Sequence, residues 1–408
     1  MKNEGAKVQL NVLISVFLML YLSRDTVLFG TNSNNTVNLI GYAGTLLLAL
    51  YWIVKGKVSR NCIVVSLVLI FLGMLTMLTT GIDIKYVYTF LLIILAAFFC
   101  SSVKFDSFVK AYQKTMLFLA AYSIIVFLLY EIAYAVISRF PIIVNESGVK
   151  FINLLFDMAM VKRPYVSHRS CGIFREPGVY MIFLILALVF ELFIMYDGNK
   201  KRTGIHIGIY ILALALTLST AGYIVLALVL MLYLLFGTNN QKHKYLKLFL
   251  FAAFVVGALW VFFDEGLFDS VFGKLIRDNY SRDSRMESIN TNIRMIAANI
   301  QHVFTGLGFS FVEGNFRYYS IDSSMGDNTN TVFRMLATYG IVYIAILMVL
   351  WFKFFAKHKN KLLAGGLFGA FVLCLFNESL IVNVILYILA FYSFNDTFNA
   401  QKSVKPML

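Results

Sequence analysis

Long apolar runs constrain this chain more than any other feature of its sequence. Runs such as 63–78 and 181–196 are apolar around most of a helix circumference, whereas a helix of a soluble protein usually keeps a polar stripe. Hydrophobic residues make up 60% of the 408 residues and charged residues 14%, so a bilayer is the solvent that these helices require. We predict an all-α polytopic membrane protein in which residues 1–408 form a single integral membrane domain.

About twelve transmembrane helices are expected from the lengths of these runs. The first run follows Lys2 and Lys7, and because no small-residue cleavage site comes after it, it is interpreted as a span rather than a signal peptide. The predicted spans are roughly residues 8–22, 36–54, 62–79, 86–100, 116–138, 178–196, 205–219, 222–236, 246–263, 331–352, 363–376 and 380–394.

The lysine clusters predict the orientation of the spans. They fall in alternate loops, for example at 200–202 and 353–361, and the positive-inside rule makes those loops and both termini cytoplasmic. A cytoplasmic (inner) membrane location is therefore expected. Two long segments, 139–178 and 264–330, become large outer loops. The net charge of +14 is spread over many short loops, so nucleic-acid binding is not expected.

In this topology, arginine and lysine are predicted to lie mostly on opposite sides of the membrane. Most lysines are cytoplasmic, while most arginines lie on or just below the outer face. Membrane insertion requires only positive charge, so it does not explain why arginine rather than lysine is found on the outer side. The planar fork of the arginine guanidinium suits bidentate binding of phosphate, which lysine cannot provide. The alternative is that these are solvated loops whose arginines pair with nearby acids such as Asp278 and Asp283.

The stretch before the sixth predicted span is rich in groups that bind anions. Pro177 suits the first turn of a helix, and Glu176 suits the positive end of the helix dipole. That account does not explain Arg169 and Arg175, which lie six residues apart at the expected membrane edge. A diphosphate head group at this depth fits both arginines.

An amphipathic helix is predicted at about 285–303 in the second outer loop. One face is expected to pack on protein or lipid, and the faces that carry Arg285, Glu287 and Arg294 to meet a polar substrate. The alternative is a helix lying in the interface with its arginines at head-group phosphates. Its apolar positions recur at steps of three and four: Met286, Ile289, Ile293, Ile296, Ile300 and Val303.

Other candidates lie later in the same loop. Glu176, Asp327 and His302, in that order, are candidate bases for a hydroxyl group. Asn330 begins the tenth predicted span, and Arg334 lies about one turn inside it. No cluster of His, Asp or Glu has metal-ligand spacing, so we predict neither metal nor cofactor. The four cysteines are too scattered to predict disulfides or a zinc site.

Three short motifs, in this order along the chain, resemble the O-antigen polymerase and ligase superfamily of bacterial envelope enzymes. The first is Gly-Ile-Phe-Arg-Glu-Pro-Gly at 172–178, and the second is Leu-Ser-Thr-Ala-Gly at 218–222. The third is Arg294 followed by Gly-Leu-Gly at 306–308, Asn330 and Tyr-Gly at 339–340. Ligases of this group carry His directly before the late Asn, where this chain has Thr329, which favours a polymerase.

The resemblance implies a metal-independent membrane glycosyltransferase of the GT-C type. Such a polymerase joins undecaprenyl-diphosphate-linked oligosaccharide repeat units on the outer face into O-antigen, capsular or exopolysaccharide, with a chain-length regulator and a flippase as partners. The alternatives are a ligase that transfers glycan to lipid A-core, a lipid-linked oligosaccharide flippase, and a receptor or scaffold. A flippase would show charge lining a central cavity and similar halves, and the sequence shows neither.

We hypothesise that an acceptor hydroxyl displaces the lipid diphosphate while fixed arginines stabilise the leaving group. The expected catalytic residues are Arg175, Glu176, Arg294 and Asp327. The expected diphosphate- or substrate-binding residues are Arg169, Arg285, His302, Asn330 and Arg334.

Overall fold

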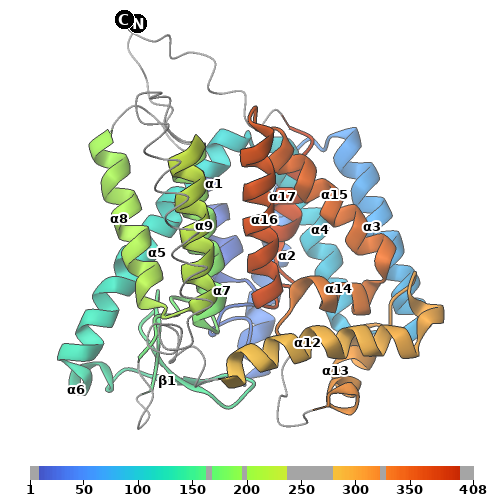
Figure 1. Cartoon of the computed structure of the whole chain (residues 1–408), viewed down its shortest axis with the longest axis horizontal. Coiled ribbons are helices and arrows are strands. Elements are labelled where there is room, and N and C mark those ends of the chain that lie inside the picture. The colour runs from blue at the N-terminus through green and yellow to red at the C-terminus, as the bar shows by residue number, and fades with distance from the viewer. Residues whose placement is uncertain (1–8, 162–167, 195–199, 237–278, 322–327, 396–408) are drawn as a thin grey trace, which may run out of the picture.

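The computed structural model describes residues 9–161, 168–194, 200–236, 279–321 and 328–395, and within them the chain is mostly helical. Most of the longer helices lie side by side (Figure 1). The helices of the described ranges are α1 (Leu10–Tyr21), α2 (Asn35–Lys55), α3 (Arg60–Thr80), α4 (Ile84–Ser102), α5 (Phe105–Ile132), α6 (Tyr134–Ile137), α7 (Pro177–Phe193), α8 (Lys200–Leu216), α9 (Thr220–Phe236), α12 (Asn279–Ala298), α13 (Phe309–Tyr319), α14 (Thr331–Tyr339), α15 (Ile341–Ala356), α16 (Lys361–Asn377) and α17 (Val384–Tyr392), with a short 3-10 helix, η2 (Ile300–His302).

Four of the helices described, α2, α3, α4 and α5, are long and apolar enough to cross a membrane. Helices α1, α7, α8, α9, α15 and α16 are apolar but shorter. Each of these overlaps a predicted span, as does α17. The predicted span at 246–263 lies outside the described residues. The helices thus have the apolar character of a membrane protein.

Polar side chains at the helix starts explain where many of the helices begin. Each accepts a hydrogen bond from a backbone N–H of the first turn, which the helix itself leaves unpaired. The capping residues are Asn34 for α2, Ser59 for α3, Asp83 for α4, Asn330 for α14, Asn360 for α16 and Asn383 for α17. The apolar runs therefore become helices with ends defined by local sequence.

The single span predicted at 331–352 is wrong, because the chain breaks at Gly340. Gly340 has φ +84°, and a Cβ there would lie 2.3 Å from the carbonyl oxygen of Phe304. The next amide, that of Ile341, donates to the carbonyl of Val303 instead of continuing the helix. Helices α14 and α15 are therefore separate, and α14 can carry its side chains in a direction that one straight span would not allow.

The segment 139–178, which was predicted to be a large outer loop, contains a small antiparallel sheet, so the expectation of an all-helical chain is wrong in this segment. Strands β1 (Ile142–Val144), β2 (Lys150–Asn153) and β3 (Met158–Met160) pair in the order β1-β2-β3, with Ile143 opposite Phe151. Phe151 is buried with Val27 of the α1–α2 loop and Cys171 before α7. The sheet therefore covers the two segments that carry the charged residues described below.

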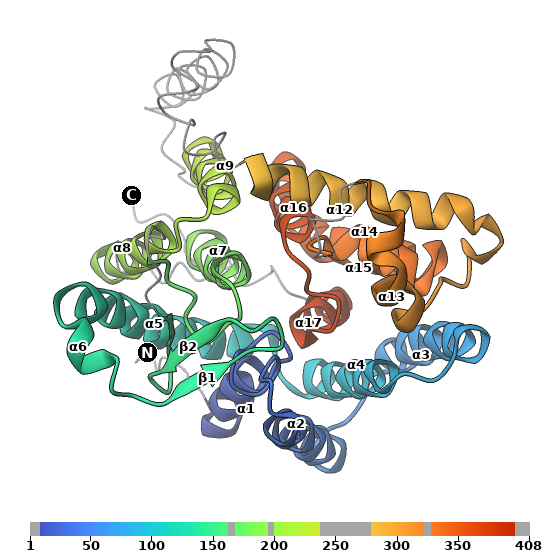
Figure 2. The same ribbon diagram turned by 90° about the horizontal axis from the view of Figure 1, so that it is seen from below.

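The helix predicted at 285–303 is present with different bounds. Helix α12 begins at Asn279 and ends at Ala298, and the last predicted turn belongs to η2. Figure 1 shows α12 lying crosswise at the lower end of the long helices, and Figure 2 shows it along one edge of the molecule.

Two helices form the interior of the molecule. Every residue of α7 and of α17 is buried, and both lie inside the ring of other helices in Figure 2. Their first residues are close together, because the backbone N–H of Arg175 before α7 and the side chain of Asn383 before α17 both donate to Asp25. The starts of both central helices thus face one site.

Candidate functional site

A cavity of about 240 Å³ lies where the starts of α7 and α17 meet the α1–α2 loop, α4, α13 and α14. Four cationic side chains and three carboxylates line it, so its wall has net positive charge. Its lining residues are Arg24, Asp25, Thr31, Lys85, Glu146, Arg175, Phe309, Glu313, Arg334, Ser379, Ile381 and Val382. Segments distant in the sequence therefore build one polar site.

Arg175 is held between the two central helices. Its Nε lies 3.4 Å from Oδ1 of Asp25, its Nη1 lies 3.6 Å from Glu176, and its Nη2 donates to the carbonyl of Ser379 at 2.6 Å. Asp25 also accepts a hydrogen bond of 2.6 Å from Asn383. Burial raises the pKa of Asp25, although the charge of Arg175 opposes this. The guanidinium is thus fixed in the cavity wall.

Arg334 enters the same wall from α14. Its Nη1 donates to the hydroxyl of Ser379 at 2.8 Å and its Nη2 to Glu313 at 2.7 Å, while its buried Nε has no partner among the described residues. Glu313 also pairs with Lys85. Burial favours the neutral carboxyl, but Arg334 and Lys85 outweigh it and the pKa of Glu313 is lowered. Glu313 therefore neutralises two cations of the wall.

Arg24 differs from the other cations of the cavity. Its Nη1 donates to the hydroxyl of Tyr42 at 2.9 Å, and within the described ranges no carboxylate forms an ion pair with it. Its charge still favours the ionised forms of the Asp25 and Glu313 carboxyls, although burial leaves the pKa of Asp25 raised. Arg24 is thus a cation in a cavity wall that an anionic ligand could neutralise directly.

Two carboxyl groups lie beside Arg175. The Glu378 carboxyl is buried against Gly178, where a Cβ would lie 1.7 Å from Oε1, and this oxygen lies 3.5 Å from Nη2 of Arg285. Burial and then the negative charge of Glu176 raise the pKa of Glu378, which shares a hydrogen bond with Glu176. The Glu176 side chain is 46% exposed. An accessible carboxyl group therefore contacts a buried one that holds its proton tightly.

The structure brings only some of the predicted site residues together. Arg175 and Arg334 line the cavity, and Glu176 lies next to it. Arg169 donates to the carbonyls of Thr217 and Leu218, and its charge acts on the Glu176 and Glu378 carboxyls. Arg285 donates to the carbonyl of Asn377 and pairs with Glu378. These last two arginines lie behind the carboxyl pair rather than in the cavity wall.

Arg294, His302 and Asn330, the other predicted residues that the structure describes, do not line the cavity. Arg294 forms two hydrogen bonds of 3.0 Å with Glu287, and that interaction lowers the pKa of Glu287 to about 2. His302 lies in η2, and buried Asn330 caps α14 while donating to the carbonyl of Phe376. Asp327 lies outside the described residues.

Sequence reasoning missed much of the cavity. Asp25, Lys85, Glu313 and Ser379 were not singled out, and Arg24 was only one of many outer arginines. Apart from the adjacent Arg24 and Asp25, each is a single polar residue in a different short segment, without a repeating pattern. The available signal was the pair Arg24-Asp25 directly after the first apolar run. Their convergence depends on which loops meet in three dimensions.

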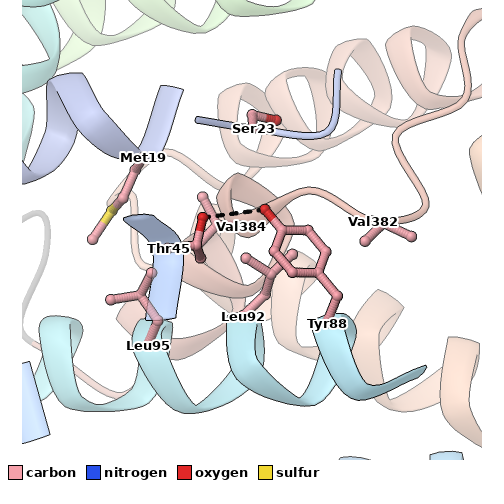
Figure 3. A pocket seen from close by; sticks show the side chains of 8 residues that line it. All are labelled: Met19, Ser23, Thr45, Tyr88, Leu92, Leu95, Val382 and Val384. Carbon is pink, nitrogen blue, oxygen red and sulfur yellow. Dashed lines mark hydrogen bonds between the residues drawn. The ribbon is translucent and has the colours of Figure 1, made fainter. Parts of the chain in front are cut away.

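A much smaller cavity lies inward from Asp25. It has a volume of about 10 Å³, which is close to the space of one water molecule. Figure 3 shows Ser23, Thr45 and Tyr88 among its apolar lining, with the hydroxyls of Thr45 and Tyr88 joined by a hydrogen bond of 3.3 Å. Because Ser23 also accepts from Asn383, this cavity belongs to the packing beneath the site.

No protein-family model matches the chain, and no curated protein matches its sequence. Within the described ranges, no three side chains of His, Cys, Asp or Glu are grouped as metal ligands would be. The observations that bear on function are therefore the cavity, its charges and the sequence motifs.

Proposed function

We propose that this chain is a membrane glycosyltransferase of the GT-C type that polymerises undecaprenyl-diphosphate-linked oligosaccharide repeat units. In this proposal it crosses a bacterial cytoplasmic membrane about twelve times, as the apolar runs predict, with both termini cytoplasmic. The cavity described above then faces outward. The three sequence motifs, at 172–178, at 218–222 and from Arg294 to Gly340, support the polymerase reaction, and the product is O-antigen, capsular or exopolysaccharide.

The observation that carries the proposal is the cationic cavity with Arg24, Arg175 and Arg334 in its wall. Arginine forks bind phosphate oxygens in pairs, and a diphosphate offers several such oxygens. Arg24 has only a neutral partner in the described structure, so it is the first contact for the ligand. The central helices α7 and α17 also begin here, and their dipoles favour negative charge at this end.

The reaction follows from placing the diphosphate in this cavity. The acceptor hydroxyl oxygen forms a bond to the anomeric carbon of the donor sugar, and the bond from that carbon to the diphosphate oxygen breaks. The electron pair leaves with undecaprenyl diphosphate. Arg24, Arg175 and Arg334 stabilise the charge that develops there, because fixed donors need no reorganisation during the reaction.

Glu176 is the proposed acceptor of the hydroxyl proton. It is the accessible member of the carboxyl pair, and it lies 3.6 Å from Arg175. Glu378, whose pKa is raised by burial, donates its proton in a hydrogen bond to Glu176, which orients the Glu176 carboxylate. Arg169 and Arg285 compensate the charge behind this pair. In this proposal Arg169 and Arg285 therefore act on the carboxyl pair instead of contacting the diphosphate directly, as the sequence had led us to expect.

The test is a gel profile of surface polysaccharide and lipid-linked intermediates in a host strain that lacks this gene, with and without a plasmid copy. Loss of long chains while single repeat units are still made and exported supports the proposal. Long lipid-linked polymer that is not transferred identifies a ligase. Repeat units trapped on the cytoplasmic leaflet identify a flippase, and an unchanged profile excludes all three activities.

A further inference from the structure

Helix α12 exposes apolar side chains on one side while it buries polar ones on another. Ser288, Thr291 and Asn292 are completely buried, whereas the side chains of Met286 and Ile293 are 56% and 45% exposed. Met295 is buried in a hydrophobic cluster, so one apolar side of the helix does pack on protein. A helix that lies on a protein core in water usually turns its polar side outward. The side of α12 that carries Met286 and Ile293 instead presents apolar groups outward, as expected if its surroundings are not water.

The buried polar face of α12 is well satisfied. The Ser288 hydroxyl donates to Oδ1 of Asn328, and Asn292 and Asn328 exchange side-chain hydrogen bonds of 3.0 Å. The backbone N–H of Thr329 donates to Ser288 at 3.1 Å. These contacts hold the residues just before Asn330, the cap of α14. The polar side therefore has a structural partner, whereas the side with Met286 and Ile293 is left exposed by the described residues.

The exposed apolar face continues onto neighbouring helices. After α12, the side chains of Ile300 and Phe304 are 62% and 65% exposed, and the next residue, Thr305, accepts a hydrogen bond from Thr76 of α3. Helix α3 is one of the helices able to cross a membrane, and it exposes Phe71 and Leu78. The face of α12 and the outer surface of α3 thus form one apolar surface.

The other end of α12 meets a second apolar helix. Arg285 donates to the carbonyl of Asn377, the last residue of α16, and Leu373 one turn earlier is exposed. Helix α12 runs between these points along the edge of the molecule (Figure 2). It lies across the helix ends rather than along them (Figure 1), which is the orientation of a helix in the plane of a membrane surface.

We propose that α12 is an in-plane helix whose exposed side chains Met286 and Ile293, together with Ile300 and Phe304 just after the helix, contact the acyl chains of bilayer lipids at the membrane boundary. The occupant is lipid because this face is continuous with the lipid-facing surface of α3. Arg294 does not serve as the head-group contact, since Glu287 binds it in two hydrogen bonds. The proposal is independent of the reaction catalysed.

The test is nitroxide labelling at single introduced cysteines. The four native cysteines are buried, so the unaltered protein provides the background for thiol labelling. Met286→Cys and Ile293→Cys are labelled after reconstitution into phosphatidylethanolamine and phosphatidylglycerol vesicles. Phe71→Cys on α3 provides the lipid-facing reference, and Lys150→Cys on β2, which is exposed, provides the aqueous reference. Power saturation then compares collision with oxygen and with a water-soluble nickel complex.

Lipid contact predicts that both α12 labels collide with oxygen more than with the nickel complex, as the label at Phe71→Cys does. Collision mainly with the nickel complex, as at Lys150→Cys, would show a face in water and overturn the proposal. Immobile labels that collide with neither reagent would show that a protein covers this face, which also overturns it. Because Met286 and Ile293 are labelled in separate variants, local misfolding of one variant does not decide the result.

Discussion

Oε1 of Glu313 lies 2.7 Å from Nη2 of Arg334, and the same carboxylate pairs with Lys85. One side chain from α13 therefore occupies two cations of the cavity wall. An anion that enters the cavity has to compete with this carboxylate for Arg334 and Lys85. Arg24, which has no carboxylate partner in the described structure, is free of that competition.

Replacing Glu313 with Gln is expected to strengthen the binding of inorganic pyrophosphate by about tenfold. The substitution removes a competing charge, and a hydrogen bond to a charged group contributes about 1.5–3 kcal/mol. Isothermal titration of the purified protein in detergent measures the affinity. Glu287→Gln is the matched control, because it removes a carboxylate that lies outside the cavity. Weaker pyrophosphate binding in Glu313→Gln would contradict this account.

Replacing Arg24 with Gln is expected to weaken pyrophosphate binding by about tenfold, since the ligand loses a charge-assisted contact. In the same titration, Arg294→Gln should bind like the unaltered protein, because Glu287 rather than the cavity surrounds Arg294. Equal losses in both variants would indicate a general effect of net charge and would count against the cavity as the binding site.

Arg175→Lys should shorten the polymer in a complemented deletion strain although it keeps the charge. Lysine has no planar fork, so it cannot contact Asp25, the Ser379 carbonyl and a phosphate together. The gel profile of surface polysaccharide measures chain length. Arg294→Lys is the control and should leave chain length unchanged. Normal long chains in Arg175→Lys would exclude bidentate recognition at this position.

Gly340→Ala is expected to destabilise the protein by about 1–3 kcal/mol, because the left-handed backbone is strained for alanine. A Cβ at Gly340 would also lie 2.3 Å from the carbonyl oxygen of Phe304. The midpoint of thermal unfolding in detergent measures the effect. Gly369→Ala in α16 is the control, since its Cβ would meet no atom within 4 Å. A midpoint unchanged in Gly340→Ala would show that the break between α14 and α15 is not required.

The free energy of unfolding should fall as pH rises from about 4.5 to about 8, the ordinary and the raised pKa of Glu378. Burial and Glu176 favour the protonated form in the folded state, so folded protein holds a proton that unfolded protein releases over this range. Above the raised pKa both states are ionised and the contribution levels off. Glu378→Gln stays neutral, so it should reduce the slope of the unfolding free energy against pH, measured by thermal unfolding between about pH 4.5 and 8. An equal slope in this variant would show that other groups cause the pH dependence.

Local sequence patterns predicted much of the helical framework. The apolar runs correspond to α1–α5, α7–α9 and α15–α17, and the steps of three and four identified α12. Arg175 and Glu176 were identified because they precede a helix start marked by Pro177. These features depend on residues a few positions apart, which the periodicity of a helix makes visible in the sequence.

Other features depended on contacts that local patterns do not contain. Gly340 breaks the predicted tenth span because the carbonyl of Phe304 lies against it, and the short strands β1–β3 pair within a segment that was predicted as a loop. The steps of three and four predicted α12, but they did not show which apolar residues would be exposed: Met286 and Ile293 are exposed, whereas Ile296 packs on a buried cluster. Burial is a property of neighbouring segments and not of the helix alone.

By itself, the sequence determined that this protein is a set of apolar helices joined by charged loops, because hydropathy and helical periodicity are properties of neighbouring residues. Only the tertiary structure decided which charges meet. The pair Arg24-Asp25 and the residues Lys85, Arg175, Glu313 and Arg334 come from five separate segments and share one cavity. The physical reason is that an ion pair forms wherever the packing of helix ends brings opposite charges within a few ångströms, whatever their separation in the chain.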